Sequence, residues 1–197
     1  MSQVPTPNSP ETDEAKPAGR IEIFYAAESQ TLQEAEMMHS EGPPPERAPL
    51  NALFAEGVAA GSSSRVLFRG PTPSSFSLVY AWFKSDYPLP AHSHSTPCLY
   101  YVIAGELAIG SKVLKAGDGF FVPANAFYSY KAGPQGVEIL EFRDACEFDF
   151  VFRGGTFPMW ERAGEIMKNN LERWKTEGPP PRDVPRQSGN IRSGEET

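Results

Sequence analysis

Residues 92–106 of this chain read HSHSTPCLYYVIAGE, and residues 117–125 read GDGFFVPAN. In both stretches short apolar runs end at glycine, proline or asparagine, which is typical of strands joined by tight turns. Strand-sized runs of the same kind recur between residues 66 and 152, and no helical pattern separates them. Many short strands at close spacing predict an all-β domain built as an antiparallel sandwich or barrel.

The two stretches share an order of landmarks: a His-x-His pair, then Gly105, then Gly117-Asp118, then Pro123. This order resembles the two signature motifs of the cupin superfamily, and the resemblance covers about Phe76 to Arg143. It implies a cupin-type antiparallel β-barrel, also called a double-stranded β-helix or jelly roll. The residues themselves agree with this fold, because Gly105 and Gly117 bracket a short hairpin and Pro123 ends a strand.

Two of the three histidines, His92 and His94, lie two positions apart between two predicted strands. In an extended segment residues i and i+2 point to the same side, so the two imidazoles converge on one face. Two neighbouring ligands of a metal ion need this arrangement. A His-x-His pair alone is more often two solvated histidines in a polar loop, but the cupin-like surroundings favour a site inside the barrel.

The chain departs from the cupin pattern at the other two ligand positions. The resemblance implies a glutamate and a third histidine there, but the sequence has Cys98 and Tyr128. A cysteine thiolate is a soft ligand, and a tyrosine can coordinate as a phenolate or bond to a metal-bound water. One interpretation is therefore an altered metal site made of His92, His94, Cys98 and Tyr128. Taken alone, Cys98 is more simply a core residue, because free cysteine is among the most buried residue types.

Two other interpretations remain open. In one, Glu138 or Glu141 joins the histidines as the carboxylate of a two-histidine, one-carboxylate set, which suits iron and oxygen chemistry. In the other, the barrel holds no metal, and His92, His94 and Tyr128 act as acid, base and hydrogen-bond donors.

The composition excludes several kinds of partner. The chain has a net charge of −7 and a pI near 5.1, so it lacks the basic patch that binding to nucleic acid requires. No apolar run approaches the roughly 18 residues of a membrane span, and the polar, proline-rich N-terminus is unlike a signal peptide. Two cysteines are too few for a disulfide framework. We therefore expect a cytoplasmic protein with reduced cysteines that binds neither nucleic acid nor a membrane.

Four segments are expected along the chain. Residues 1–19 form a disordered lead, 20–157 the cupin barrel with an N-terminal extension, 158–177 a C-terminal amphipathic helix and 178–197 a disordered tail. The helix is predicted from apolar residues at three- and four-residue steps, namely Trp160, Ala163, Met167, Leu171 and Trp174. Within the extension, residues 21–25 read as a short strand and residues 30–39 as one or two helical turns.

Aromatic residues make up 12% of the chain and gather in the predicted strands, which indicates a pocket with flat apolar walls. Such a pocket suits an aromatic or polyketide-like small molecule. The leading hypothesis is a small cupin metalloenzyme, with His92, His94 and Tyr128 as catalytic residues and dioxygenase as the first choice of reaction. Fe²⁺ is the first choice of metal, with Zn²⁺, Ni²⁺ or Mn²⁺ as alternatives.

The resemblance to cupins also permits a metal-free isomerase, cyclase or lyase, because one fold supports many chemistries. A further alternative is a non-catalytic module that binds a small ligand in the barrel. Cupins are often dimers, so a homodimer is expected under every one of these hypotheses.

Overall fold

The computed structural model describes residues 20–182, so the predicted disordered lead and most of the predicted tail lie outside the described residues. Within this range nine strands are present: β1 (Met38–Ser40), β2 (Ser62–Arg69), β3 (Ser77–Phe83), β4 (Pro88–Ser93), β5 (Cys98–Ile109), β6 (Lys112–Lys115), β7 (Gly119–Val122), β8 (Tyr128–Arg143) and β9 (Phe148–Phe152). The helices are η1 (Ala26–Glu28) and η2 (Pro45–Leu50), both of the 3-10 type, and α1 (Asn51–Gly61) and α2 (Phe157–Thr176).

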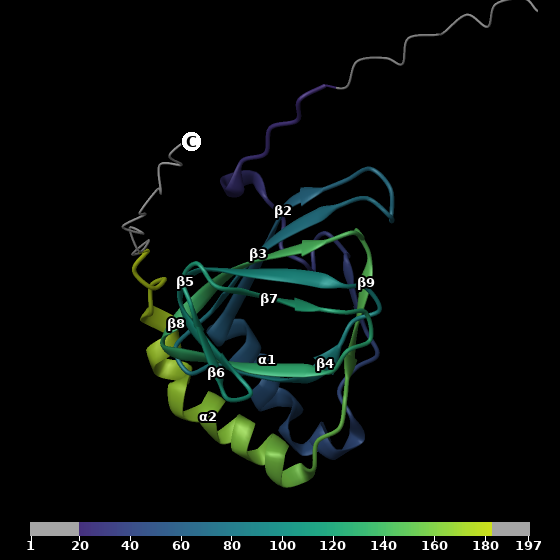
Figure 1. Cartoon of the computed structure of the whole chain (residues 1–197). Coiled ribbons are helices and arrows are strands. Elements are labelled where there is room, and N and C mark those ends of the chain that lie inside the picture. The colour runs from purple at the N-terminus through teal and green to yellow at the C-terminus, as the bar shows by residue number, and fades with distance from the viewer. Residues whose placement is uncertain (1–19, 183–197) are drawn as a thin grey trace, which may run out of the picture.

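The strands form one curled sheet that bends into a jelly-roll half-barrel (Figure 1). They run in the order β1-β9-β4-β8-β3-β2, and β5 pairs with β6, β7 and β8. The long strand β8 joins the two walls, because its first residues pair with β4 and its last residues pair with β3 and β5. The predicted cupin-type barrel is therefore confirmed, with one parallel pair, β1 with β9, that the antiparallel prediction did not include.

A close backbone contact explains the motif glycine Gly105. This residue has a φ of +71°, a conformation that side chains disfavour, and it lies where β5 passes the bend of β8. A Cβ atom at Gly105 would lie 2.1 Å from the carbonyl oxygen of Gly136. Only glycine allows the two strands to approach this closely, so the first motif ends at a point inside β5 where the barrel has no room for a side chain.

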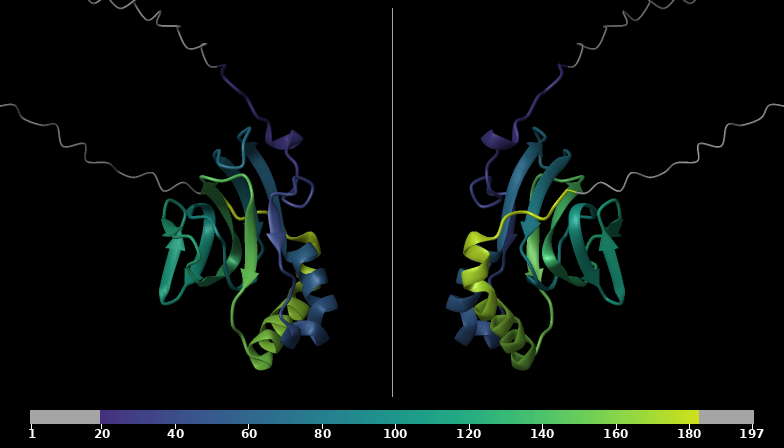
Figure 2. Two further views of the ribbon diagram at one scale, coloured as in Figure 1. Left: turned by 90° about the vertical axis from the view of Figure 1, so that its right-hand side faces the viewer. Right: turned by 90° about the vertical axis from the view of Figure 1, so that its left-hand side faces the viewer.

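Helices α1 and α2 pack together on one side of the curled sheet (Figure 2). The buried stripe of α2 contains Trp160, Met167 and Trp174, which confirms the predicted amphipathic helix. Helix α1 was not predicted, because its glycines lower helix propensity and weaken the periodic pattern. One of them, Gly61, is needed for close packing, since a Cβ atom there would lie 2.6 Å from the Trp174 ring.

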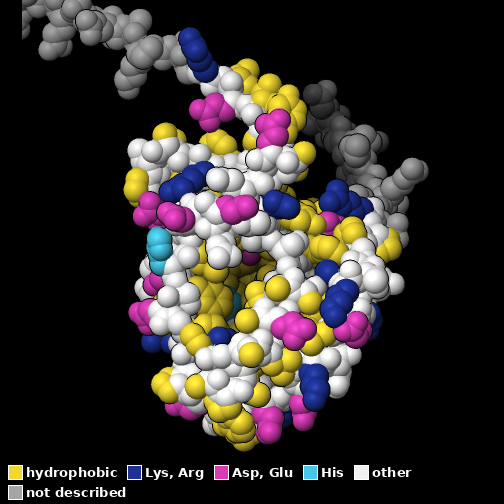
Figure 3. All heavy atoms as spheres, turned by 180° about the vertical axis from the view of Figure 1, so that it is seen from behind, with side chains coloured by type: hydrophobic (Ala, Val, Ile, Leu, Met, Phe, Trp, Pro, Cys, Tyr) yellow, Lys and Arg dark blue, Asp and Glu magenta, His cyan; other side chains and the backbone are white. Residues whose placement is uncertain are grey.

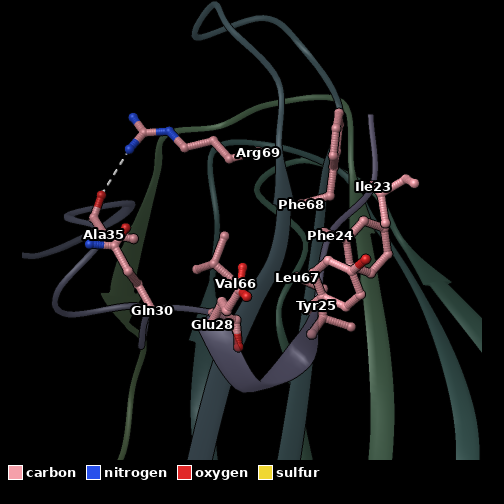
Figure 4. A pocket seen from close by; sticks show the side chains of 11 residues that line it. Ile23, Phe24, Tyr25, Glu28, Gln30, Ala35, Val66, Leu67, Phe68 and Arg69 are labelled. Atoms are coloured by element: carbon pink, nitrogen blue, oxygen red, sulfur yellow. Dashed lines mark hydrogen bonds between the residues drawn. The ribbon is translucent and has the colours of Figure 1, made fainter. Parts of the chain in front are cut away.

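The segment before β1 lies along the outer strand β2 (Figure 4). Phe24 packs near Phe68 with ring centroids 6.5 Å apart, and the Arg69 guanidinium donates a hydrogen bond to the Ala35 carbonyl. The strand expected at residues 21–25 is absent, because this stretch pairs with no neighbour among the described residues and Ile21 is 92% exposed. Residues 30–39 form turns followed by β1 instead of helix.

No helix within residues 20–182 is long and apolar enough to cross a membrane.

Candidate functional site

A cavity of about 600 Å³ occupies the interior of the half-barrel. Its walls are largely aromatic and include Tyr100, Tyr128, Tyr130, Phe148, Phe150 and Phe152. The hollow is visible from behind the molecule, where hydrophobic side chains surround an opening with a histidine inside it (Figure 3). A concave, mostly apolar site with a few polar groups is the usual form of a small-molecule site.

The two histidines of the first motif lie together in this cavity. His92 is in β4 and His94 follows it, and the ring centroids are 4.9 Å apart. The His92 Nδ1 lies 2.8 Å from the Pro90 carbonyl oxygen, and the His94 Nδ1 lies 2.5 Å from the Asp149 carbonyl oxygen. A carbonyl oxygen can only accept a hydrogen bond, so each ring carries a proton on Nδ1. In the neutral ring Nε2 is then an unprotonated acceptor.

Burial in the cavity also determines the charge of the two rings. Burial lowers the pKa of both imidazoles to about 4, and the positive charge of Arg143 contributes to the effect at His94. Both rings are therefore neutral at neutral pH. The His92 Nε2 has no hydrogen-bond partner within residues 20–182.

A chain of hydrogen bonds leads from Arg143 to His94. The Tyr128 hydroxyl lies 3.1 Å from the His94 Nε2 and must donate to it, because that nitrogen carries no proton. The Tyr100 hydroxyl in turn donates to the Tyr128 oxygen, and the Arg143 Nη2 donates to the Tyr100 oxygen at 3.3 Å. Burial raises the pKa of both tyrosines well above the ordinary value, so both hydroxyls keep their protons. In this arrangement each hydrogen bond of the chain therefore has a defined donor and acceptor.

The charge at the start of the chain is balanced inside the protein. Arg143 donates to the Glu141 carboxylate at 2.6 Å, and both side chains are buried. Burial alone would lower the pKa of Arg143, but the surrounding groups, the Glu141 carboxylate foremost, raise it overall. Arg143 thus stays charged and its pair with Glu141 is neutral as a whole.

Strand register explains how the sequence assembles these groups. His92 pairs with Tyr128 across β4 and β8, whereas Tyr100 pairs with Glu141 across β5 and β8. Side chains that face each other across neighbouring strands share one face of the sheet. The two ends of β8 therefore bring the histidines and the Tyr100–Arg143 group into one cavity.

The other predicted ligand positions are placed differently. Cys98 is buried beside Arg143 but is not among the cavity-lining residues, and burial raises the pKa of its thiol to about 12. Glu138 faces the outside of the sheet, where it accepts hydrogen bonds from Tyr80 and Arg182. Only Glu141, of the carboxylates considered from the sequence, lies in the cavity with the histidines.

These positions test whether the site fits the divalent metal that the cupin resemblance implies. The two imidazoles fit, because a backbone carbonyl on Nδ1 is the usual support of a metal-bound histidine. The remaining groups do not complete a ligand set in this arrangement. Cys98 does not line the cavity, the Tyr128 hydroxyl bonds to the His94 Nε2, and Glu141 is already paired with Arg143. Within residues 20–182 no group of three His, Cys, Asp or Glu side chains is arranged to hold a metal ion.

Two groups of site residues were missed from the sequence. Arg143 shares a face with Glu141 because it lies two positions further along β8, and two charged residues at inward positions of an apolar strand were a usable signal. Phe148 and Phe150 lie against the histidines, with Phe150 stacked on His92 at 4.4 Å between centroids. Phe148 and Phe150 alternate with Glu147 and Asp149, which is typical of a strand with one buried face, but the sequence does not show that this face borders the histidines.

The jelly-roll strand order, the two glycine-punctuated motifs and the inward-facing histidine pair are consistent with a cupin-type fold. No family model and no curated protein matches the chain.

Several solved structures are similar to it. An RmlC-like cupin from Shewanella frigidimarina NCIMB 400 is 26% identical and matches 44% of this chain and 78% of its own length, with a TM-score of 0.38. KdgF from Halomonas sp. is 22% identical over 44% of this chain and 82% of its own, with a TM-score of 0.38. The polyketide cyclase RemF from Streptomyces resistomycificus is 15% identical over 77% of this chain and 99% of its own, with a TM-score of 0.49.

Proposed function

We propose that this protein is an enzyme that moves a proton on an aromatic or polyketide-like carbonyl compound, as an isomerase, cyclase or lyase does. One observation carries the proposal. The unprotonated His92 Nε2 faces the cavity with no hydrogen-bond partner among the described residues, and the His92 ring is 4.3 Å from the Tyr128 ring between centroids. A base beside a hydroxyl donor is the arrangement needed to remove a proton next to a carbonyl group.

In the proposed reaction, the His92 Nε2 accepts a proton from a carbon next to the substrate carbonyl. The electron pair of the broken C–H bond forms a carbon–carbon double bond, and the carbonyl oxygen becomes an enolate. The Tyr128 hydroxyl donates a hydrogen bond to this oxygen. The His92 imidazolium then returns the proton to the same carbon or to another one, which leaves the enzyme unchanged.

The hydrogen-bond chain supports this role of Tyr128. The contact from Tyr128 to His94 is 3.1 Å, which is long for a hydroxyl donor, so the hydroxyl can turn to a substrate oxygen at small cost. The charged Arg143 polarises Tyr100, and Tyr100 in turn polarises Tyr128. A base with a pKa of about 4 is effective only where donors of this kind stabilise the enolate.

The test is carbon-bound hydrogen exchange in D₂O, followed by ¹H NMR, with EDTA-treated protein and a panel of aryl ketones and aromatic 1,3-diketones. We expect at least one compound to exchange faster than in buffer, and EDTA to leave the rate unchanged. Exchange no faster than in buffer for compounds that bind would contradict the proposal and leave the ligand-binding module.

The metal-dependent dioxygenase is the second candidate function, and the carbonyl-supported Nδ1 atoms of His92 and His94 favour it. Plasma mass spectrometry of the untreated protein decides between the candidates. About one Fe, Zn, Ni or Mn per chain, lost in the His92→Ala/His94→Ala double variant, together with activity that EDTA abolishes, would replace the first proposal with the second. The cytoplasmic location and the homodimer that the sequence predicts stay predictions under both.

A further inference from the structure

Arg47 lies in the same cavity as the histidines, in a box of aromatic rings. It belongs to η2 and borders the cavity from the helical side of the molecule. Its guanidinium carbon is 4.6 Å from the Phe54 ring centroid, 4.7 Å from that of Phe152 and 5.8 Å from that of Trp160. Aromatic faces hold a guanidinium in place but do not neutralise its charge.

This charge has no carboxylate partner within residues 20–182. Arg47 forms no ion pair there, and its one hydrogen bond, from Nε to the Asn51 side-chain oxygen, is long at 3.4 Å. Burial lowers the pKa of Arg47, so the charged form is held at a cost that an anion in the cavity would offset.

The charged residues around the cavity also favour binding of an anion. The chain has a net charge of −7, but the cavity is lined by three arginines, Arg47, Arg65 and Arg143, and by one acidic residue, Glu141. Because Glu141 is paired with Arg143, no unpaired acidic side chain lines the cavity within the described residues. The cavity is therefore suited to an anionic ligand.

A continuous aromatic wall connects Arg47 to the histidines. The guanidinium lies over Phe152, whose ring centroid is 4.9 Å from that of Phe150, and Phe150 is stacked on His92 with an angle of 6° between the rings. Strand β9 supplies both phenylalanines. An aromatic molecule bound along this strand would therefore meet Arg47 beside Phe152 and His92 beside Phe150.

We propose that Arg47 binds a carboxylate of the substrate, so that the substrates of this cavity are planar aromatic carboxylic acids. The planar fork of the guanidinium matches a carboxylate with two parallel hydrogen bonds. The assignment rests on the cavity described under the proposed function, but it does not depend on the proton transfer or on a metal.

Binding of 2-naphthoate and of its neutral counterpart 2-naphthamide to the full chain, measured by titration calorimetry in EDTA-containing buffer, tests the proposal. We expect 2-naphthoate to bind wild type more tightly than 2-naphthamide. In Arg47→Gln we expect 2-naphthoate to bind about 10- to 100-fold more weakly, the range for a lost charged hydrogen bond, and 2-naphthamide to be unaffected. Arg47→Lys keeps the positive charge but not the planar fork, so its affinity for 2-naphthoate should lie between those of wild type and Arg47→Gln.

Arg162→Gln is the matched control, because Arg162 is exposed on α2 and lies outside the cavity. Failure of 2-naphthoate to bind wild type, equal affinity of wild type for the two ligands, or unchanged 2-naphthoate affinity in Arg47→Gln would overturn the proposal. The comparison of the two ligands needs no variant, so a misfolded Arg47→Gln does not obscure the result. Selective binding of 2-naphthoate, together with no accelerated deuterium exchange in any ketone or diketone of the panel, would uphold this assignment and count against the proposed proton transfer alone.

Discussion

His92→Gln is expected to lower kcat/KM for deuterium exchange about 100- to 10,000-fold, the usual contribution of a general base. Glutamine is polar and of similar reach, but its amide does not accept a proton from carbon. The loss should appear in kcat, because Phe150 and the other cavity walls that bind the substrate remain. The measurement is the initial exchange rate against substrate concentration, made on EDTA-treated protein.

His39→Gln provides the matched control for this variant. His39 is the third histidine of the chain and is exposed in β1, outside the cavity. It should keep the wild-type rate. An exchange rate in His92→Gln equal to that of His39→Gln would remove His92 from the reaction.

Arg143→Met is expected to reduce the free energy of unfolding by about 3–5 kcal/mol, the usual cost of leaving one partner of a buried ion pair alone. Methionine keeps part of the contact of Arg143 with Phe148, whose ring centroid is 4.1 Å from the guanidinium carbon, but it leaves the Glu141 carboxylate buried without a cation. Urea unfolding at neutral pH measures the change.

Two further variants separate the buried charge from the loss of side-chain volume. The double variant Arg143→Met/Glu141→Gln should recover part of the lost stability, because it leaves no unpaired charge in the barrel. Lys175→Met breaks the exposed pair with Glu172 and should leave the free energy of unfolding almost unchanged. A double variant no more stable than Arg143→Met would show that packing, and not charge, explains the loss.

The fold was predictable because its turns require particular residues. Gly105 ends the first motif where a side chain would collide with the Gly136 carbonyl, so a backbone constraint appears directly in the sequence. Helix α1 was not predictable in the same way. Its glycines are explained by contact with α2, as at Gly61 against Trp174, and a contact between distant segments leaves no local pattern.

The candidate site was predictable only in part. The spacing of His92 and His94 placed both rings on one face, and the structure brings both of them and Tyr128 into one cavity. The partners of these residues depend on strand register, which pairs Tyr100 with Glu141 across strands that are distant in sequence. Arg47 lies in the short helix η2 between β1 and β2, so no sequence pattern connected it with the histidines.

The most direct test of this account is the ¹⁵N NMR spectrum of the histidine side chains in EDTA-treated protein, recorded from about pH 8 down to about pH 5 and assigned with His92→Gln and His94→Gln. Because burial lowers the pKa of both rings to about 4, they should stay neutral throughout, and they take up a second proton only as the pH falls towards 4. The account predicts that His92 and His94 each carry one proton, on Nδ1, with an unprotonated Nε2. A charged ring above pH 6, or a neutral ring protonated on Nε2, would contradict the proposed base.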